Sequence, residues 1–202
     1  MPQKNVFGKP EGFDEVQDVL LHACCAPCSS AIVEWMLNNG VRPTIFYYNP
    51  NIWPREEYEI RKNESKRHAE SLGIRWIDGD YEHEDWLEFV RGPYIVEKEP
   101  ERGRRCEQCF IQRLTATARK AAELGIRYFA TTLASSRWKS LEQIERAGLQ
   151  AQQAAPGTTF WAQNWRKGGL QERRNQLLRE YNFYNQRYCG CEFSMSVANS
   201  TR

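Results

Sequence analysis

The seven cysteines of this 202-residue chain are the residues best suited to chemistry, because they occur only in close groups. The three groups are Cys24, Cys25 and Cys28; Cys106 and Cys109; and Cys189 and Cys191. Thiols that only fill a core would be scattered singly, whereas metal ligands cluster because one centre needs several thiolates. Seven also exceeds the four thiolates that one tetrahedral zinc or one cubane iron–sulfur cluster takes. The surplus predicts a second metal centre or a redox pair beside the first.

The first group contains a C-x-x-C spacing, Cys25-Ala-Pro-Cys28, which lets two thiols chelate one metal or form a disulfide. Pro27 favours the start of a helix there, and a helix N-terminus stabilises thiolates. On an extended backbone Cys24 and Cys25 would point to opposite sides. We therefore expect these two to serve one centre in the same manner only if the turn rotates them together.

The other two groups have comparable local features. Cys106-Glu-Gln-Cys109 opens a predicted helix, so its thiols also lie at a helix N-terminus. Cys189-Gly-Cys191 is a short pincer in which the glycine gives the backbone freedom to wrap a metal. Three groups that contain every thiol of the chain predict a metal site far better than one C-x-x-C does.

Few other side chains suggest a role in chemistry. His22 lies in the first predicted strand, where it is a core group rather than a ligand, and His68 and His83 are predicted on helix surfaces. Asp78 and Asp80 follow the third strand and could bind a metal, relay a proton or simply be solvated. Three tryptophans in loop-like stretches could stack on a base. They are Trp53, Trp161 and Trp165.

The composition indicates a soluble chain in a reducing compartment. The polar N-terminus has no apolar core of a signal segment, and no run of about 20 apolar residues exists to span a membrane. We therefore expect a cytoplasmic protein without membrane contact, in which clustered cysteines are metal ligands or catalytic rather than disulfides. The net charge of +2 hides an asymmetry: residues 1–100 carry 11 basic and 18 acidic side chains, so residues 101–202 carry 17 and 8. This asymmetry suggests a polyanionic partner, with Arg173 and Arg174 as expected contacts.

Strand and helix patterns alternate along the chain. Strands are predicted at 18–23, 44–48, 75–77, 128–132 and 159–161, and helices at 29–38, 55–71, 82–90, 106–124, 140–146 and 170–181. Gly73 and Gly125 each end a helix in a left-handed conformation before an isoleucine that folds back onto it. The alternation predicts an α/β fold, a parallel sheet sandwiched by helices with a helical C-terminal extension. We expect a polar lead-in over residues 1–17, one metal-binding catalytic domain over 18–194 and a tail over 195–202.

Five strings of this sequence resemble one known family over nearly the whole domain. They are Leu21-His-Ala-Cys-Cys-Ala-Pro-Cys-Ser29; Tyr48-Asn-Pro-Asn-Ile52 with Glu57-Tyr58; Arg105-Cys-Glu-Gln-Cys-Phe110; Thr131-Thr-Leu133 with Ser135 and Lys139; and Tyr188-Cys-Gly-Cys-Glu-Phe-Ser194. Together they resemble the cobalamin-independent epoxyqueuosine reductases, the QueH family. Arg137 and Asn185 depart from the family pattern where proline and arginine are usual, which leaves substrate-loop details open.

The resemblance implies a fold similar to the nucleotide-α-hydrolase-like (HUP) sandwich, a [4Fe–4S] cluster and one additional iron ion. It implies deoxygenation of epoxyqueuosine to queuosine at the wobble base of tRNA, with contact to the anticodon arm. That reaction consumes two electrons and two protons, so an external electron donor is required. A metal ion with an open position could act there as a Lewis acid on the epoxide oxygen.

We assign the thiols between the two centres as a hypothesis. Cys25, Cys106, Cys109 and Cys189 are expected to hold the cluster, and Cys24, Cys28 and Cys191 the second metal. Asp80 is the candidate carboxylate or proton donor, and Cys24 is a further candidate catalytic residue. All seven thiols are expected in one pocket.

Two alternative functions remain open from the sequence. A zinc-stabilised RNA-binding module would use the thiols only for structure. A thiol-based tRNA sulfur-transfer enzyme would work without iron and carry a reducible disulfide, with Cys25 and Cys28 as the expected pair.

Overall fold

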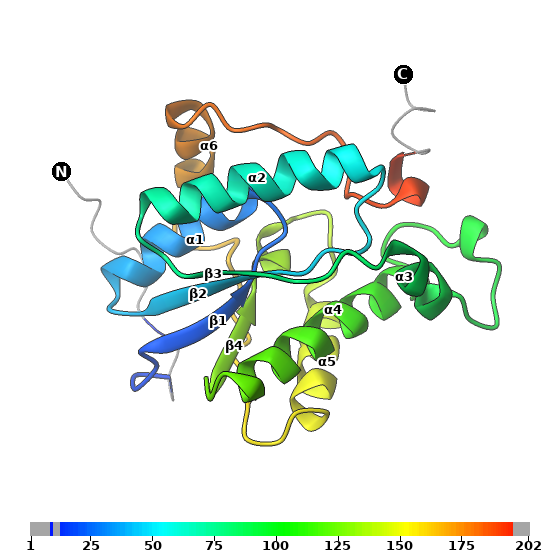
Figure 1. Ribbon diagram of the computed structural model, residues 1–202, viewed down its shortest axis with the longest axis horizontal. Coiled ribbons are helices and arrows are strands. Elements are labelled where there is room, and N and C mark those ends of the chain that lie inside the picture. The colour runs from blue at the N-terminus through cyan, green and yellow to red at the C-terminus, as the bar shows by residue number, and fades with distance from the viewer. Residues whose placement is uncertain (1–8, 10–12, 196–202) are drawn as a thin grey trace.

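The computed structural model describes residue 9 and residues 13–195. In that part the chain forms an α/β fold, with a parallel sheet between layers of helices (Figure 1). This confirms the predicted fold class. The predicted lead-in over 1–17 and tail over 195–202 fall largely outside the described residues.

The sheet has five strands in the order β3-β2-β1-β4-β5, and each neighbouring pair is parallel. The strands are β1 (Asp18–His22), β2 (Arg42–Tyr47), β3 (Trp76–Asp78), β4 (Tyr128–Thr131) and β5 (Thr159–Phe160). The chain first builds outward from β1 to β3 and then returns to the other side of β1. The strand order therefore reverses between β1 and β4, and open α/β sheets bind ligands beyond the carboxyl ends at such a switch point.

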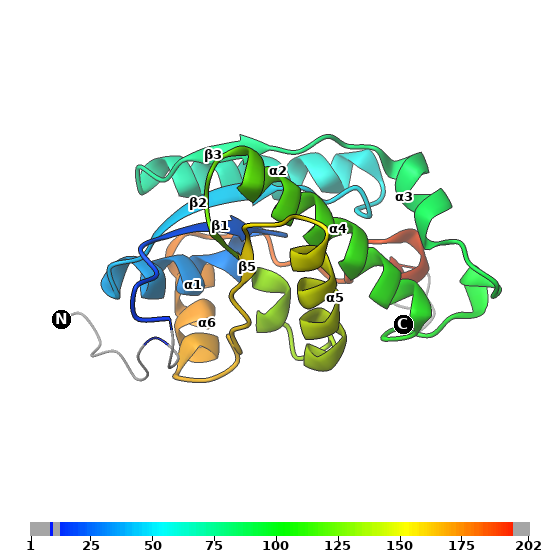
Figure 2. The same ribbon diagram turned by 90° about the horizontal axis from the view of Figure 1, so that it is seen from below.

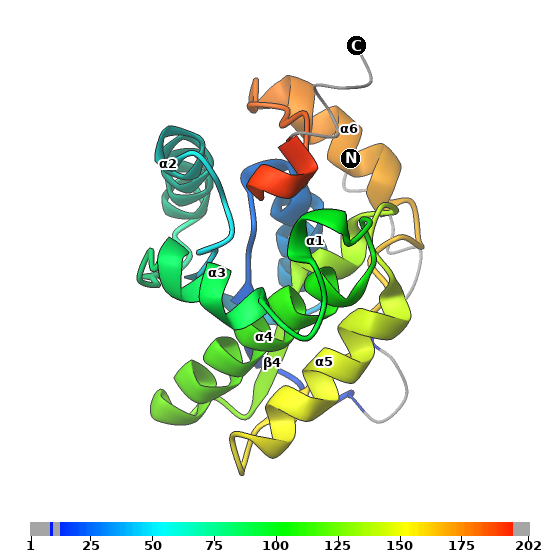
Figure 3. The ribbon, with the colours of Figure 1, turned by 90° about the vertical axis from the view of Figure 1, so that its right-hand side faces the viewer.

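Helices cover both faces of the sheet. They are α1 (Ala26–Asn38), α2 (Arg55–Ser71), α3 (His83–Val90), α4 (Arg104–Glu123), α5 (Leu141–Gln153) and α6 (Leu170–Glu180), with short 3-10 helices η1 (Val96–Lys98) and η2 (Thr132–Ser135). Helices α1, α2 and α6 lie on one face and α4 and α5 on the other, where α4 and α5 pack side by side (Figures 2 and 3). None of the helices in the described part of the chain has both the length and the apolar character needed to cross a bilayer.

Two helices extend beyond their predicted bounds. Helix α1 begins at Ala26 rather than Ser29, because Pro27 fits the first turn, where its missing N–H costs nothing. Helix α5 continues to Gln153 although the prediction ended at Arg146. Gly148 lies inside the helix, where its lack of a side chain allows α5 to approach the ring of Phe160 on β5.

The core lies between the sheet and its helices. In β1 the side chains of Val19, Leu20 and Leu21 are fully buried, as expected for a central parallel strand covered on both faces. Trp161 and Trp165 pack against Trp35 of α1 at ring-centroid distances of 6.0 and 5.4 Å. Both are at most 1% exposed, so the expectation that they could stack on a base is wrong.

Candidate metal centre

The first cysteine group lies at the switch point, directly after β1. Cys25 is the residue before α1, in an extended conformation with φ −173° and ψ 160°, and Cys28 lies in the first turn of that helix. The Cys24 and Cys25 sulfurs are 3.8 Å apart, so the turn does rotate these neighbours toward each other. The ligand atoms of Cys24, Cys25 and Cys28 all lie within 4.8 Å of one another. We call these three residues the thiol triad.

The three thiols of the triad shift one another's pKa values. Hydrogen bonds from the thiols of Cys25 and Cys28 hold the pKa of Cys24 well below its usual value. Burial raises the pKa of Cys25, and the contact with Cys24 raises the pKa of Cys28 to about 11. One thiolate stabilised by two neighbouring thiols is a preformed site for a soft cation, which would displace the remaining protons.

A second set of thiols comes from two distant segments. Cys106 and Cys109 lie in the first turns of α4, and Cys189 and Cys191 lie in the C-terminal segment. Cys106, Cys189 and Cys191 line one cavity together with Lys139, while the buried Cys109 clusters with Cys191. We call these four cysteines the thiol tetrad.

Burial and like-charge repulsion raise the pKa values of two tetrad thiols. Burial, followed by the neighbouring Cys189, raises the pKa of Cys106 to about 11 and that of Cys191 to about 12. The backbone N–H of Arg102 donates to the Cys106 sulfur at 3.3 Å, which favours the thiolate. Cys106 and Cys191 are therefore held as neutral groups that a metal ion would deprotonate on binding.

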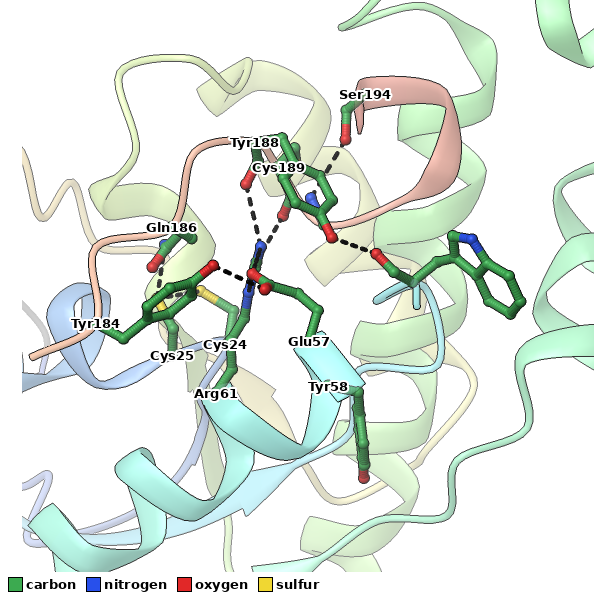
Figure 4. Close-up of polar contacts among 12 residues, drawn as sticks. Cys24, Cys25, Glu57, Tyr58, Arg61, Tyr184, Gln186, Tyr188, Cys189 and Ser194 are labelled. Carbon is green, nitrogen blue, oxygen red and sulfur yellow. Dashed lines mark hydrogen bonds and ion pairs between the residues drawn. The ribbon is translucent and has the colours of Figure 1, made fainter. Parts of the chain in front are cut away.

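A buried ion pair positions the C-terminal segment beside the triad. Arg61 of α2 is 2% exposed and pairs with Glu57 at 2.7 Å. Its guanidinium also donates to the carbonyl oxygens of Cys189 at 3.2 Å and Tyr188 at 3.3 Å, and Tyr184 donates to Glu57 at 2.8 Å (Figure 4). This network fixes Cys189 although its own segment has no regular structure.

Gly190 is required at the centre of that segment. Its φ is +139°, a conformation that other residues rarely adopt. A Cβ there would lie 3.2 Å from side-chain atoms of Arg61, Asn51 and Ile52. A side chain at position 190, between Cys189 and Cys191, would therefore be strained and crowded. The carbonyl oxygen of Gly190 accepts a hydrogen bond of 2.8 Å from the Trp53 N–H.

Two buried or half-buried cations face the thiols. Arg113 of α4 is 2% exposed, donates to the Cys109 sulfur at 3.8 Å and also donates to Asn49. Burial alone would lower the pKa of Lys139, but the thiols of Cys189, Cys24 and Cys28 outweigh burial and raise it. Lys139 is therefore a charged ammonium group near thiols of both the triad and the tetrad.

The carboxamide of Gln186 closes the triad from the C-terminal side. Its Nε2 donates to the Cys25 sulfur at 2.9 Å (Figure 4) and lies 3.7 Å from the Cys28 sulfur. Its Oε1 is buried and has no hydrogen-bond partner in the described structure. Sequence analysis missed Gln186, Arg61 and Arg113. The only available signal was that Gln186 stands three residues before a cysteine pair.

Several residues singled out by sequence have other roles. His22 is a fully buried core group, as predicted, with Nδ1 2.9 Å from Thr131 Oγ1 and Nε2 3.1 Å from Tyr48 O. The surface placement of His68 and His83 is wrong, since they are 6% and 7% exposed. His68 packs edge-on against the ring of Tyr181, and His83 lies 3.3 Å from Glu192.

The two acidic candidates lie in the region after β3. Asp78 is paired with Lys62 at 3.2 Å, and Asp80 is exposed in the loop before α3. Neither belongs to the thiol triad or borders the tetrad cavity. Asp80 therefore lies at the expected edge of the sheet but belongs neither to the thiol triad nor to the cavity of the thiol tetrad.

Arg173 does not provide a free positive charge. It pairs with Glu34 of α1 at 2.8 Å and with Glu180 at 2.9 Å. These contacts fasten α6 to α1. Its charge is partly compensated within the fold, and its contact with a polyanion stays a prediction.

The donor set fits a metal centre. All seven cysteines are free thiols, and the triad brings three soft ligands together without a disulfide. Thiolates of this kind select zinc, copper(I) or iron–sulfur clusters over hard cations. The structure thus supports a metal cofactor bound at least by Cys24, Cys25 and Cys28.

Comparisons with known proteins point to one family. The sequence model described as "Epoxyqueuosine reductase QueH" matches residues 19–197. A protein named epoxyqueuosine reductase QueH from Acinetobacter baylyi is 43% identical over 189 residues, which cover 94% of this chain and 85% of that protein. Proteins of the same name from Haemophilus influenzae and Thermotoga maritima are 41% and 35% identical, covering 96% and 88% of this chain and 76% and 90% of their own lengths.

Proposed function

The chain belongs to the QueH family of epoxyqueuosine reductases, and on that premise we propose that it deoxygenates epoxyqueuosine to queuosine at the wobble position of a tRNA. The observation that carries this proposal is the thiol triad at the switch point of the sheet, together with the cavity that Cys106, Cys189 and Cys191 line with Lys139. A bound metal there would act as a Lewis acid on the oxygen of the carbon–oxygen bond that the reaction breaks.

We propose that the thiols divide by proximity. The tetrad of Cys106, Cys109, Cys189 and Cys191 supplies the four thiolates that a [4Fe–4S] cluster takes. The triad of Cys24, Cys25 and Cys28 then holds the additional iron. This division differs from the sequence-based hypothesis, which placed Cys25 with the cluster and Cys191 with the second metal.

The reaction removes the epoxide oxygen as water with two electrons and two protons, leaving a carbon–carbon double bond. When bound, the metals would relay electrons from the external donor and supply a Lewis acid for the oxygen. The chain must supply the protons and exclude competing water. Lys139 Nζ is a candidate donor of the first proton, because Lys139 borders the cavity that Cys106, Cys189 and Cys191 also line. Asp80 remains a candidate for the second proton, and Cys24 is a candidate for direct catalysis as the most acidic thiol of its triad.

The proposed partners are a tRNA, bound through its anticodon arm, and an external electron donor. The basic excess of residues 101–202 supports a polyanionic partner. Unlike Arg173, the exposed Arg137 makes no ion pair with a described acidic residue. We place the reaction in the cytoplasm, where the thiols stay reduced.

Anaerobic purification of the wild type and of Cys→Ser variants tests the function and the division together. We expect iron and sulfide in the wild type, and conversion of an epoxyqueuosine-containing RNA with dithionite as reductant. Cys106→Ser and Cys191→Ser should lose the broad visible absorption of the cluster. Cys28→Ser should keep that absorption, because the cluster is intact, but should lose the activity and the additional iron ion. Ser29→Ala, in the same turn of α1, is the matched control and should retain the metal.

Different results would favour the alternatives. A colourless protein with stoichiometric zinc and no turnover would identify a structural RNA-binding module. Turnover without iron, together with a reducible bond between Cys25 and Cys28, would identify a thiol enzyme. Loss of cluster absorption in Cys28→Ser but not in Cys191→Ser would overturn the proposed division of the thiols.

A further inference from the structure

Trp138 is the most exposed large apolar side chain among residues 13–195, with 65% of its surface accessible. Exposing a tryptophan to this extent forgoes the stabilisation that its burial would give. The other tryptophan of the adjoining core, Trp165, is 1% exposed by contrast. Trp138 belongs to the turn Ser136–Lys139, which follows β4 and η2 at the switch point.

The turn that carries Trp138 is held rigidly. Arg102 donates to the carbonyl oxygens of Trp138 at 2.7 Å and Arg137 at 3.1 Å. Arg166 donates to the carbonyl oxygens of Lys139 at 2.6 Å and of Ser136. Four successive carbonyl groups are thus bound by two arginines from distant segments. An exposed aromatic ring on a mobile loop would need no such support.

Arg102 connects this turn to the metal centre. Its backbone has φ +66°, a left-handed conformation that is uncommon for a residue other than glycine. Gln143 holds that conformation by donating to Arg102 O at 2.8 Å. The same Arg102 donates its N–H to the Cys106 sulfur. The backbone of Trp138 is therefore fixed relative to the thiols, and Trp138 borders the same cavity as Cys106, Cys189 and Lys139.

The surroundings of the ring are cationic. The Arg137 guanidinium lies over the indole at 5.1 Å from its centroid, and Lys139 follows directly in sequence. An exposed aromatic face flanked by cations matches a partner that combines flat π-systems with negative charge. Single-stranded RNA has both properties, whereas a protein donor offers no regular array of flat faces.

We propose that Trp138 is a stacking platform for a nucleobase of the substrate RNA, next to the nucleotide whose modified base enters the cavity. This inference rests on the proposed function and adds to it a residue that binds the RNA outside the reacting base. Arg137 supplies a positive charge beside the platform. The two arginines beneath the turn keep the ring in place before the RNA arrives, which reduces the entropy cost of binding.

Binding of a labelled RNA hairpin that carries epoxyqueuosine tests the proposal, measured by anisotropy with anaerobically purified holoenzyme. Trp138→Ala should raise Kd about 5- to 150-fold, the range for loss of one stacked base. The slope of log Kd against log salt should stay unchanged, because no charge is removed. Trp138→Phe should stay within about 5-fold of the wild type, since it keeps a flat ring. Leu37→Ala is the control. It truncates an exposed apolar side chain at the C-terminal end of α1, away from the thiol triad, and should not change Kd.

Several outcomes would overturn the inference. One is a Kd for Trp138→Ala within 2-fold of the wild type, with iron content and melting temperature preserved. Another is normal RNA binding and dithionite-driven turnover but slow reduction by a protein donor, which would make Trp138 a donor-docking residue. Failure of the proposed function itself looks different, because the wild type would then neither bind nor deoxygenate the RNA.

Discussion

Arg61 shows how a single buried side chain can position a metal ligand from another part of the chain. Its charge is balanced by Glu57, and its remaining donors hold the backbone of Tyr188 and Cys189. A buried ion pair contributes little net stability, but removing one partner leaves the other charge desolvated and unpaired. The pair therefore matters chiefly for the position of the C-terminal segment.

Replacement of Arg61 tests this role at the level of one residue. Arg61→Met should lower the free energy of unfolding by about 3–5 kcal/mol, because Glu57 loses its partner. It should also reduce iron content, because Cys189 loses its support. Arg42→Met is the matched control, since the pair of Arg42 with Asp18 is exposed and should contribute under about 1 kcal/mol. Denaturant titration measures both variants, and equal losses would contradict the proposed role.

Residue types could be predicted from sequence, but side-chain environments could not. The grouping of cysteines predicted a thiol site, and the structure brings the first group together as a triad. The direction of Cys24 depends on the turn after β1, which no spacing reveals. His68 was misplaced for a similar reason, since only the return of the chain after α6 buries it against Tyr181.

At the level of elements, the glycine joints were predictable because their chemistry is local. Gly73 and Gly125 both have left-handed backbones, with φ of 65° and 67°. The N–H of Ile74 bonds back to Ala69 O, and that of Ile126 to Ala121 O, each at 2.9 Å. Gly148 could not be interpreted in the same way, since its role depends on Phe160 from another element.

The packing of α5 against β5 predicts whether Gly148→Ala raises or lowers the free energy of unfolding. In an isolated helix Gly148→Ala would stabilise by about 1 kcal/mol. Here the new Cβ would overlap the Phe160 ring, and overpacking costs about 1–3 kcal/mol. We expect a net destabilisation of about 1 kcal/mol in denaturant titration. In a Phe160→Leu background the same change should cost less, and an equal cost in both backgrounds would contradict the packing argument.

At the level of the whole molecule, the topology explains why distant thiols meet. Strands β1 and β4 are neighbours in the sheet, so the segments after them converge on one edge. The sequence predicted the alternation of elements and hence the class of fold. It could not give the strand order, which alone decides that Lys139 after β4 faces Cys24 after β1.

Removal of the metal should loosen the molecule unevenly. The segment over residues 183–195 is held by the Arg61 network and would also be held by a metal bound at Cys189 and Cys191, whereas β1 is buried in an apolar core. Metal ligation adds its binding free energy to the folded state, so its loss should be felt first in that segment. Hydrogen exchange before and after anaerobic chelation should accelerate over residues 183–195 and leave β1 protected. A uniform acceleration across the chain would show that the segment is not selectively stabilised by the metal.

The wide separation of the thiols along the chain also dictates the timing of maturation. During translation Cys24, Cys25 and Cys28 emerge first, whereas Cys189 and Cys191 are synthesised only after every strand of the sheet. A nascent polypeptide therefore exposes an incomplete ligand set throughout most of its elongation. A metal centre that uses both ends of the chain can therefore be completed only after the ribosome has passed Cys191, in a protein whose sheet has already been made.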